Sequence, residues 1–108
     1  MKSLTKLEQH ILLAIFHLKD NAYLITIREF IKDKTDKNHA IATIYVPLER
    51  LRKLGCLDTI DGGPSPKVGG RSIKYYRLTK AGFHLLSEMK KINDRMWLGF
   101  PEGVPLEK

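Results

Sequence analysis

The sequence contains one cysteine, fewer acidic than basic residues and no long apolar run. Its single cysteine, Cys56, cannot form a disulfide within the chain, so we expect a reducing, cytoplasmic setting. The apolar stretch at residues 11–16 is far too short to cross a bilayer, and no targeting signal is recognisable. The sequence therefore predicts neither a disulfide-stapled secreted domain nor a membrane partner.

The sequence also lacks the residue patterns of enzymes, metal sites and phosphate-binding loops. Its four histidines are scattered, without metal-ligand spacing and without a cysteine pair. Cys56 follows the helix-ending Gly55 and precedes the apolar Leu57, so we expect a small buried side chain and not a nucleophile. The run at residues 69–71 lacks the Gly-Lys-Ser/Thr ending of a phosphate loop. We therefore expect a protein that is not an enzyme and that needs no metal or cofactor.

Positive charge is what the chain has in excess. The 108 residues include 19 Lys and Arg against 12 Asp and Glu, a net charge of +7. The excess is concentrated between Leu24 and Arg77, where eleven basic residues oppose six acidic ones. Such an excess favours anionic partners through long-range attraction and counterion release, and double-stranded DNA is the partner we expect. An ordinary solvated basic face is the alternative.

Hydrophobic periodicity and capping residues predict four helices and one hairpin. Thr5 and Glu8 form the pattern of a capping box before the first helix, and Thr79 is placed to cap the last. Residues 22–26 form either a brief strand or a docked connection. The expected helices cover residues 6–18, 26 or 27–34, 40–54 and 80–96 or 97; the expected strands cover 56–61 and 72–78, around a glycine-rich loop at 62–70.

The third expected helix carries a clear core stripe and an awkward proline. Ile41, Ile44, Leu48 and Leu51 recur at spacings of three and four residues, which is typical of a buried helix face. Pro47 would remove a backbone hydrogen bond and clash one turn back. We therefore expect either a kink at Pro47 or a helix that starts later than residue 40.

The order helix, helix, helix, hairpin, helix predicts a mainly α fold with a small β-hairpin. Three helices followed by a two-stranded wing form the winged variant of the helix-turn-helix. We expect residues 1–78 to form a DNA-binding winged helix-turn-helix domain. Residues 79–97 would add a C-terminal dimerisation helix packed on the same domain, and residues 98–108 an irregular tail.

Specific motifs resemble those of PadR-like transcriptional regulators. Residues 7–15 are similar to the first helix of that family, residues 42–55 to its tyrosine-containing recognition helix, and residues 69–79 to its wing and the junction with the last helix. The chain departs from the family at Ala42, where glycine is usual, and at Pro47. The resemblance covers about residues 4–96. It implies a single-domain homodimer that represses transcription, with the last helix contributing to the dimer contact. Some members of the family respond to small aromatic or phenolic ligands.

The outer face of the third helix supplies candidates for DNA contact. Ala42, Val46 and Lys53 lie opposite the core stripe, and small or branched side chains there would let the helix approach base edges closely. Thr43 and Val46 could contact a thymine methyl, and Arg50 could reach a guanine or a phosphate. Tyr45 lies to one side, where phosphate contact and simple packing are equal alternatives.

The hairpin supplies further DNA-binding candidates. Three basic residues bracket its flexible tip, from which they could lie along the DNA backbone or enter a minor groove. An ordinary mobile hairpin is the alternative. The complete set of DNA-binding candidates is Thr43, Tyr45, Val46, Arg50, Lys53, Lys67, Arg71 and Lys74.

The last helix carries an apolar stripe that is too long for the core of so small a domain. A second copy of the chain is the simplest partner for it. Trp97 ends the stripe; we favour packing in the interface, with stacking on a small aromatic effector as the alternative. The expected interface residues are Leu85, Leu86, Met89, Ile92, Met96 and Trp97.

Two functions of different classes are open at this point. We favour a sequence-specific DNA-binding regulator, acting as a dimeric repressor. The alternative is a winged-helix module for protein–protein interaction that does not bind DNA, because a fold does not fix a function. A docking module would be expected to carry acidic or large apolar residues on the outer face of the third helix, where Glu49 is the only acid.

Overall fold

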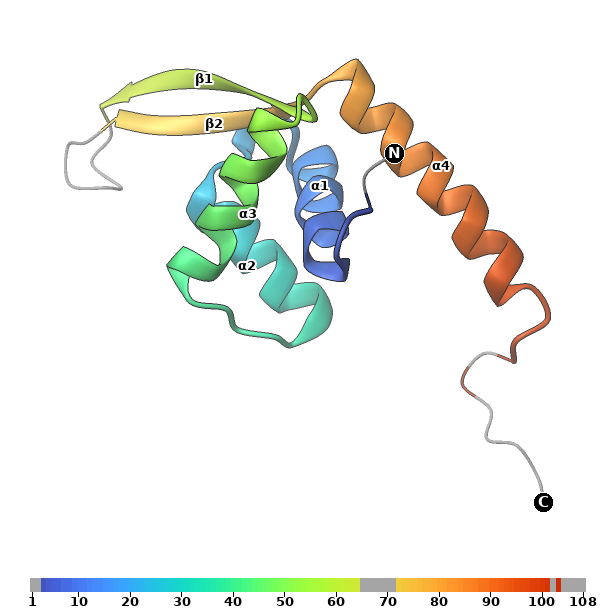
Figure 1. The fold of residues 1–108 in the computed structure, drawn as a ribbon. Coiled ribbons are helices and arrows are strands. Elements are labelled where there is room, and N and C mark those ends of the chain that lie inside the picture. The colour runs from blue at the N-terminus through green and yellow to red at the C-terminus, as the bar shows by residue number, and fades with distance from the viewer. Residues whose placement is uncertain (1–2, 65–71, 102, 104–108) are drawn as a thin grey trace.

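Three helices lie beneath a two-stranded hairpin, and a long fourth helix leads away from the hairpin's end (Figure 1). This computed structural model describes residues 3–64, 72–101 and 103. The elements are α1 (Lys6–Leu18), a 3₁₀ turn η1 (Lys19–Asn21), α2 (Leu24–Thr35), α3 (Ile41–Lys53), β1 (Leu57–Pro64), β2 (Ser72–Leu78) and α4 (Lys80–Trp97). The predicted fold class, a mainly α winged helix-turn-helix with a small hairpin, is confirmed.

Helix α1 begins with the predicted capping box and forms the centre of the core. The Glu8 backbone N–H donates to Thr5 Oγ1 at 3.1 Å, and the Thr5 N–H donates to Glu8 Oε1 at 2.9 Å. These two bonds satisfy backbone donors that a helix start leaves free. Ile11, Leu12 and Ile15 are buried on the inner face of the helix. The predicted bounds, 6–18, are confirmed.

Helix α2 begins earlier than the sequence predicts, at Leu24 and not at residue 26 or 27. The Tyr23 N–H donates to Thr26 Oγ1 at 2.9 Å, so Thr26 lies inside the first turn and caps it. The segment before the helix is docked on the hairpin: the Tyr76 N–H donates to the Ala22 carbonyl at 2.8 Å, and Tyr23 bridges to Tyr75. A tertiary contact, which local pattern does not reveal, therefore sets where α2 starts.

Helix α3 continues through Pro47 and starts at Ile41, with Ala40 as its N-cap residue. The start is therefore one residue later than residue 40, and Pro47 lies in the helix interior. Ile44, Leu48 and Leu51 are completely buried, as predicted, but Ile41 is 41% exposed and does not belong to the core. At the first turn of α3 the stripe points past the edge of the core and into a surface hollow.

The hairpin is antiparallel, and its register pairs Leu57 with Leu78 and Asp61 with Lys74. The second strand has the predicted bounds. The first runs from Leu57 to Pro64 instead of 56–61, and extends past a register shift into the expected glycine loop. Gly62 permits this extension, because a Cβ atom there would lie 2.2 Å from the ring of Tyr75.

Helix α4 has the predicted bounds and leaves the domain as it proceeds (Figure 1). Thr79 Oγ1 accepts a bond from the Gly82 N–H at 3.0 Å. Gly82 allows the helix to approach the hairpin closely, since a Cβ atom there would lie 2.3 Å from the Cys56 carbonyl oxygen. Leu85 and Leu86 pack against the core, whereas residues 90–98 are exposed. Among the described residues, no helix is long and apolar enough to span a membrane.

Candidate nucleic-acid interface

The outer face of α3 carries small, uncharged and basic side chains that are open to solvent. Ala42, Thr43 and Lys53 are exposed, and Val46 is 65% exposed. A large aliphatic side chain in that position gains nothing from water, and its branched shape suits contact with a base edge. The buried stripe of the helix packs on the core, so this opposite face points outward.

Arg50 is held toward α1 by Glu8, a contact that sequence reasoning missed. An Arg50 guanidinium nitrogen donates to Glu8 Oε2. The Glu8 side chain is 6% exposed and that of Arg50 is 43% exposed, so one edge of the guanidinium is committed while the rest faces solvent. Glu8 thus caps α1 and fixes the C-terminal half of α3 with its two oxygens.

Glu49, the one acid near the outer face of α3, is neutralised by its neighbours. Arg52 Nε donates to Glu49 Oε1 at 3.0 Å, the Tyr76 hydroxyl donates to Oε2 at 3.1 Å, and Lys74 Nζ lies 3.7 Å from Oε2. Burial alone would raise the pKa of Glu49, but these hydrogen bonds and charges outweigh burial and lower it. Burial and the bond to Glu49 raise the pKa of the Tyr76 hydroxyl. Glu49 therefore ties α3 to the wing without making the surface acidic.

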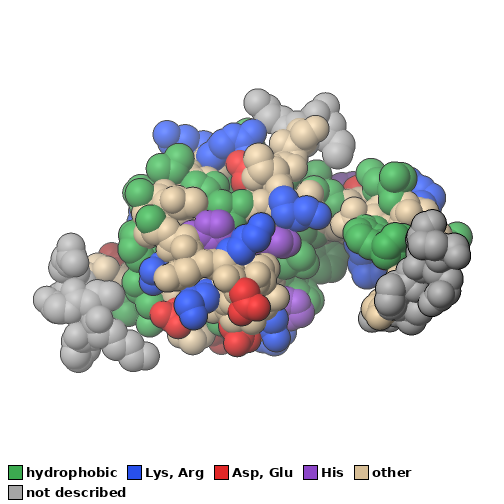
Figure 2. All heavy atoms as spheres, turned by 90° about the horizontal axis from the view of Figure 1, so that it is seen from below, with side chains coloured by type: hydrophobic (Ala, Val, Ile, Leu, Met, Phe, Trp, Pro, Cys, Tyr) green, Lys and Arg blue, Asp and Glu red, His purple; other side chains and the backbone are tan. Residues whose placement is uncertain are grey.

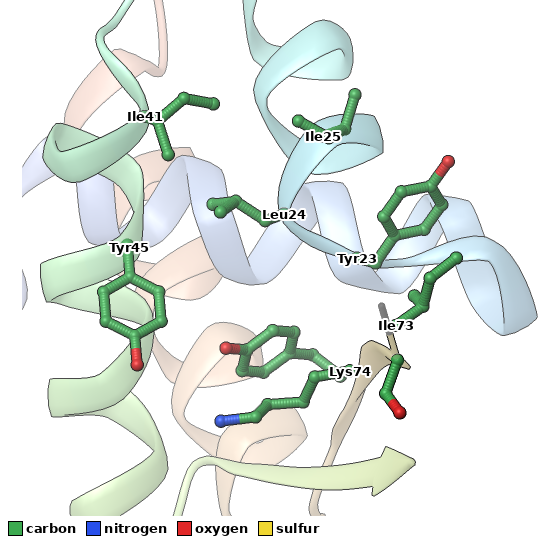
Figure 3. A pocket seen from close by; sticks show the side chains of 9 residues that line it. Tyr23, Leu24, Ile25, Ile41, Tyr45, Ile73 and Lys74 are labelled. Carbon is green, nitrogen blue, oxygen red and sulfur yellow. The ribbon is translucent and has the colours of Figure 1, made fainter. Parts of the chain in front are cut away.

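The remaining DNA-binding candidates come from α3 and the wing. Tyr45 is half exposed and lies across a hollow from Lys74 on β2 (Figure 3). The structure thus brings Tyr45 and Lys74 to one side of α3. Lys67 and Arg71 lie outside the described residues.

The predicted apolar stripe of α4 is half buried in its first part and exposed in its last part. Leu85, Leu86 and Met89 are half buried, the first two against the core of their own domain. Met96 and Trp97 are 77% and 61% exposed, and hydrophobic side chains gather on this part of the molecule in Figure 2. Part of the stripe therefore does serve the domain's own core, and only its distal part is left uncovered.

A groove of about 430 Å³ separates α4 from α1, which we call the α1–α4 groove. Its exposed aromatic and aliphatic residues are Leu13 and Phe16 on α1 and Phe83 on α4. The sequence analysis did not single out these three side chains. The sequence does contain a signal for this apolar surface. Leu13 and Phe16 lie off the core stripe of the first helix, and they are too apolar for a solvated face.

No metal or nucleophilic site is evident in the part of the chain that the structure describes. No group of three or more His, Cys, Asp and Glu side chains there could hold a metal ion. Cys56 is buried, and burial together with the charge of Glu8 raises the pKa of its thiol. A thiol with a raised pKa is a poor nucleophile.

Comparison with solved structures identifies proteins that have a similar fold. A PadR-like transcription factor from Bacteroides fragilis superposes with a TM-score of 0.72 at 27% identity, over 83% of this chain and 82% of that one. A PadR family transcription regulator from Clostridium difficile R20291 gives a TM-score of 0.67 at 23% identity, over 85% and 90% of the two chains. The chain is similar in fold to PadR-like transcription regulators.

A further solved structure has a similar fold. BpsR of Bordetella bronchiseptica, whose DNA binding is regulated by 6-hydroxynicotinic acid, matches with a TM-score of 0.61 at 21% identity, over 92% of this chain and 69% of that one. No protein-family model matches the PadR-like chain, and neither does any curated protein sequence.

Proposed function

We propose that this PadR-like protein is a sequence-specific DNA-binding transcriptional regulator that acts as a dimeric repressor. The observation that carries the proposal is the outer face of α3, which is exposed, basic at Lys53 and free of unpaired acid because Glu49 is neutralised. The similarity of the chain to the Bacteroides fragilis transcription factor supports the same proposal. The similar protein from Clostridium difficile is likewise a transcription regulator, and we propose that this chain is not an enzyme.

The side chains divide into base contacts and phosphate contacts. Thr43 and Val46 at the middle of α3 are proposed to meet base edges, where a thymine methyl would pack against them. Lys53, Tyr45 and Lys74 are proposed to contact phosphates, together with Lys67 and Arg71. Arg50 would use the solvent-facing edge of its guanidinium for a guanine or a phosphate while Glu8 holds the other edge.

The dimer is proposed to form through α4. Ile92, Met96 and Trp97 are exposed and apolar, and the α1–α4 groove offers a matching surface on the same molecule. A two-fold axis would place the distal half of one α4 against the groove of a second copy. Closed symmetry of this kind can set two recognition helices about 34–36 Å apart, one turn of DNA.

Trp97 has two proposed roles within that dimer. Its ring packs edge-on against Phe100 with centroids 5.2 Å apart, which favours a role in covering the interface. The second role is stacking on a small aromatic effector, for which the regulation of BpsR by 6-hydroxynicotinic acid is a precedent in a similar fold.

Selection of bound sequences from a random DNA pool tests the function. A palindromic enriched site is expected, and its affinity should fall with salt at a log–log slope of about −0.9 per phosphate contact. No enrichment together with salt-independent retention on heparin would instead favour a protein-interaction module.

A further inference from the structure

An ion pair at the edge of the outer face of α3 joins Arg50 to Glu8 on α1. Arg50 follows Val46 by four residues and precedes Lys53 by three, so the three side chains leave neighbouring positions on the helix surface. Val46 and Lys53 belong to the face that is proposed to meet DNA. The guanidinium of Arg50 therefore starts beside that face, and its contact with Glu8 decides which way it points.

The contact with Glu8 occupies one end of the Arg50 guanidinium and leaves another edge free. Nη1 of Arg50 donates to Oε2 of Glu8. Among the residues that the structure describes, Nε and Nη2 of Arg50 donate to no acceptor, and the side chain is 43% exposed. These two nitrogens lie in one plane with their N–H bonds side by side, so they form a fork of two donors with a fixed spacing.

The charge of Arg50 is matched by one carboxylate whose position is fixed. Glu8 is 4% exposed, and its second oxygen, Oε1, accepts a hydrogen bond at 2.9 Å from the backbone at the start of α1. Glu49, the neighbour of Arg50 in the chain, instead accepts a bond from Arg52 Nε at 3.0 Å. Glu8 and Arg50 therefore form a one-to-one pair with no net charge.

A neutral pair distinguishes between the two acceptors that DNA offers to an arginine. A phosphate attracts a free cation at long range, but a cation that is already paired with a carboxylate loses most of this attraction. Guanine presents two neutral acceptors, N7 and O6, side by side in the major groove, and a planar fork of two donors matches them. Holding the fork in place before binding also reduces the entropy cost of ordering a long side chain. The pair therefore suits a base edge better than the backbone.

We propose that Arg50 reads a guanine through its Nε and Nη2 donors, and that Glu8 is the positioning residue that makes this contact specific. Glu8 would hold the guanidinium at a fixed angle and keep it from binding phosphates. This assignment deepens the proposed function and rests on it, because it chooses guanine over phosphate as the acceptor for Arg50. It also gives a residue of α1 that does not contact DNA a part in the choice of sequence.

Selection of bound sequences from a random DNA pool, run in parallel with the unaltered protein and with Arg50→Gln, tests the base contact. The unaltered protein should enrich a guanine at one position of each half-site. The amide of Arg50→Gln can still donate to Glu8, but the charged fork is lost. Preference for that guanine should therefore fall by about tenfold, while the preferences at the other positions stay as they are.

A modified duplex tests the same contact on the unaltered protein, so this measurement does not depend on how any variant folds. Replacing the enriched guanine by 7-deazaguanine exchanges the N7 acceptor for a C–H group and leaves base pairing intact. The unaltered protein should bind this duplex about fivefold more weakly, since one charged hydrogen bond is lost. Arg50→Gln should bind the modified and the unmodified duplex with equal affinity.

Replacement of Glu8 tests its positioning role. Glu8→Gln keeps an oxygen for the start of α1 and removes the charge, so Arg50 becomes a free cation. Preference for the guanine should fall by about fivefold. Affinity for DNA that lacks the enriched site should rise, and its log–log salt slope should steepen by about 0.9 for each phosphate contact that Arg50 gains.

Two comparisons separate positioning from folding. A role of Glu8 in folding alone would make Glu8→Gln bind every sequence more weakly, with an unchanged salt slope. Lys53→Gln removes a proposed phosphate contact, so it should make the salt slope shallower by about 0.9 per contact and leave the guanine preference intact.

The outcomes separate this inference from the proposed function. A guanine preference that depends on both Arg50 and Glu8, with a steeper salt slope in Glu8→Gln, supports the inference. An enriched site that lacks the guanine, or that Arg50→Gln and Glu8→Gln select as strongly as the unaltered protein, overturns it and leaves the proposed function standing. Weaker binding of every sequence by Glu8→Gln at an unchanged slope also overturns the positioning role. If the unaltered protein enriches no sequence, the proposed function is contradicted and the guanine contact with it.

Discussion

Two carboxylates, Glu8 and Glu49, attach the recognition helix α3 to the rest of the domain. Glu8 is 4% exposed and joins α3 to α1 through Arg50. Glu49 joins α3 to the wing through Tyr76 and Lys74. Buried or half-buried charges of this kind contribute mainly by fixing geometry, because their attraction is offset by the cost of leaving water. The orientation of the side chains proposed to contact DNA therefore depends on residues that are not among them.

Replacement of Glu8 tests this attachment. Glu8→Ala should lower the free energy of unfolding by about 2 kcal/mol, because the capping bond is lost and Arg50 loses its partner. The loss of the ion pair costs less than it would in the core, since Arg50 is partly exposed to solvent. Glu8→Gln keeps an oxygen for the Thr5 N–H and loses only the charge, so it should cost about half as much. Urea denaturation measures both; equal losses would show that the capping bond contributes nothing.

The pH dependence of stability tests the Glu49 cluster. Because the folded pKa of Glu49 is lowered, its contribution is complete above the unfolded value of 4.5 and is lost as pH falls through the lower folded pKa. The stability difference between the unaltered protein and Glu49→Gln should therefore stay constant from about pH 7 to pH 5.5 and shrink below about pH 4.5. A difference that instead widens on acidification would contradict the lowered pKa of Glu49.

At the scale of the element, α3 tolerates a proline in its interior. Pro47 has no N–H, so the Thr43 carbonyl lacks the hydrogen bond that a helix normally supplies. Ile44, Leu48 and Leu51 are completely buried on either side of it, and their packing offsets this loss. Tertiary burial and not helix propensity therefore holds α3 together.

Pro47→Ala should stabilise the protein by about 1–3 kcal/mol, because it restores one backbone hydrogen bond and relieves the ring's contact with the preceding turn. Thermal unfolding measures the change. Val46→Ala is the matched control, since it alters an exposed neighbour and no backbone donor, and it should change stability by at most about 0.5 kcal/mol. A destabilised Pro47→Ala variant would mean that the proline ring is itself part of the packing.

At the scale of the whole molecule, α4 extends from the domain and gives it a long shape (Figure 1). The largest dimension is 58 Å and the smallest 21 Å. A helix with this much uncovered apolar surface gains stability from a partner, and a small domain has few other means of increasing burial. The proposed dimer would bury the distal half of α4.

Met89→Asp tests that dimer by placing a carboxylate at the half-buried edge of the α1–α4 groove. An unpaired charge there should cost several kcal/mol and shift the protein to monomer in sedimentation. His84→Asp, on an exposed position of the same helix, should leave the dimer intact. A Met89→Asp variant that remains dimeric with unchanged DNA affinity would exclude this face of α4 as the dimer contact.

Local sequence pattern was sufficient for most of the fold. The Thr5–Glu8 capping box, the stripe through Ile44, Leu48 and Leu51, and the caps around α4 act within one or two helical turns, so their effect can be predicted without knowing what lies opposite. The hairpin and the winged order of elements followed from the same local signals. The residues of the outer face of α3 could be predicted too, because they lie opposite the buried stripe on the helix.

What only the tertiary structure decided depends on residues that are distant in the chain. The Glu8–Arg50 pair spans 42 positions, and the docking of Ala22 on β2 sets the start of α2. The exposure of Ile41 depends on where the core ends, which periodicity does not specify. The hollow between α2, α3 and β2 and the α1–α4 groove likewise exist because separate elements leave space between them. A sequence pattern states which face of an element is apolar; the packed structure alone determines whether that face is covered.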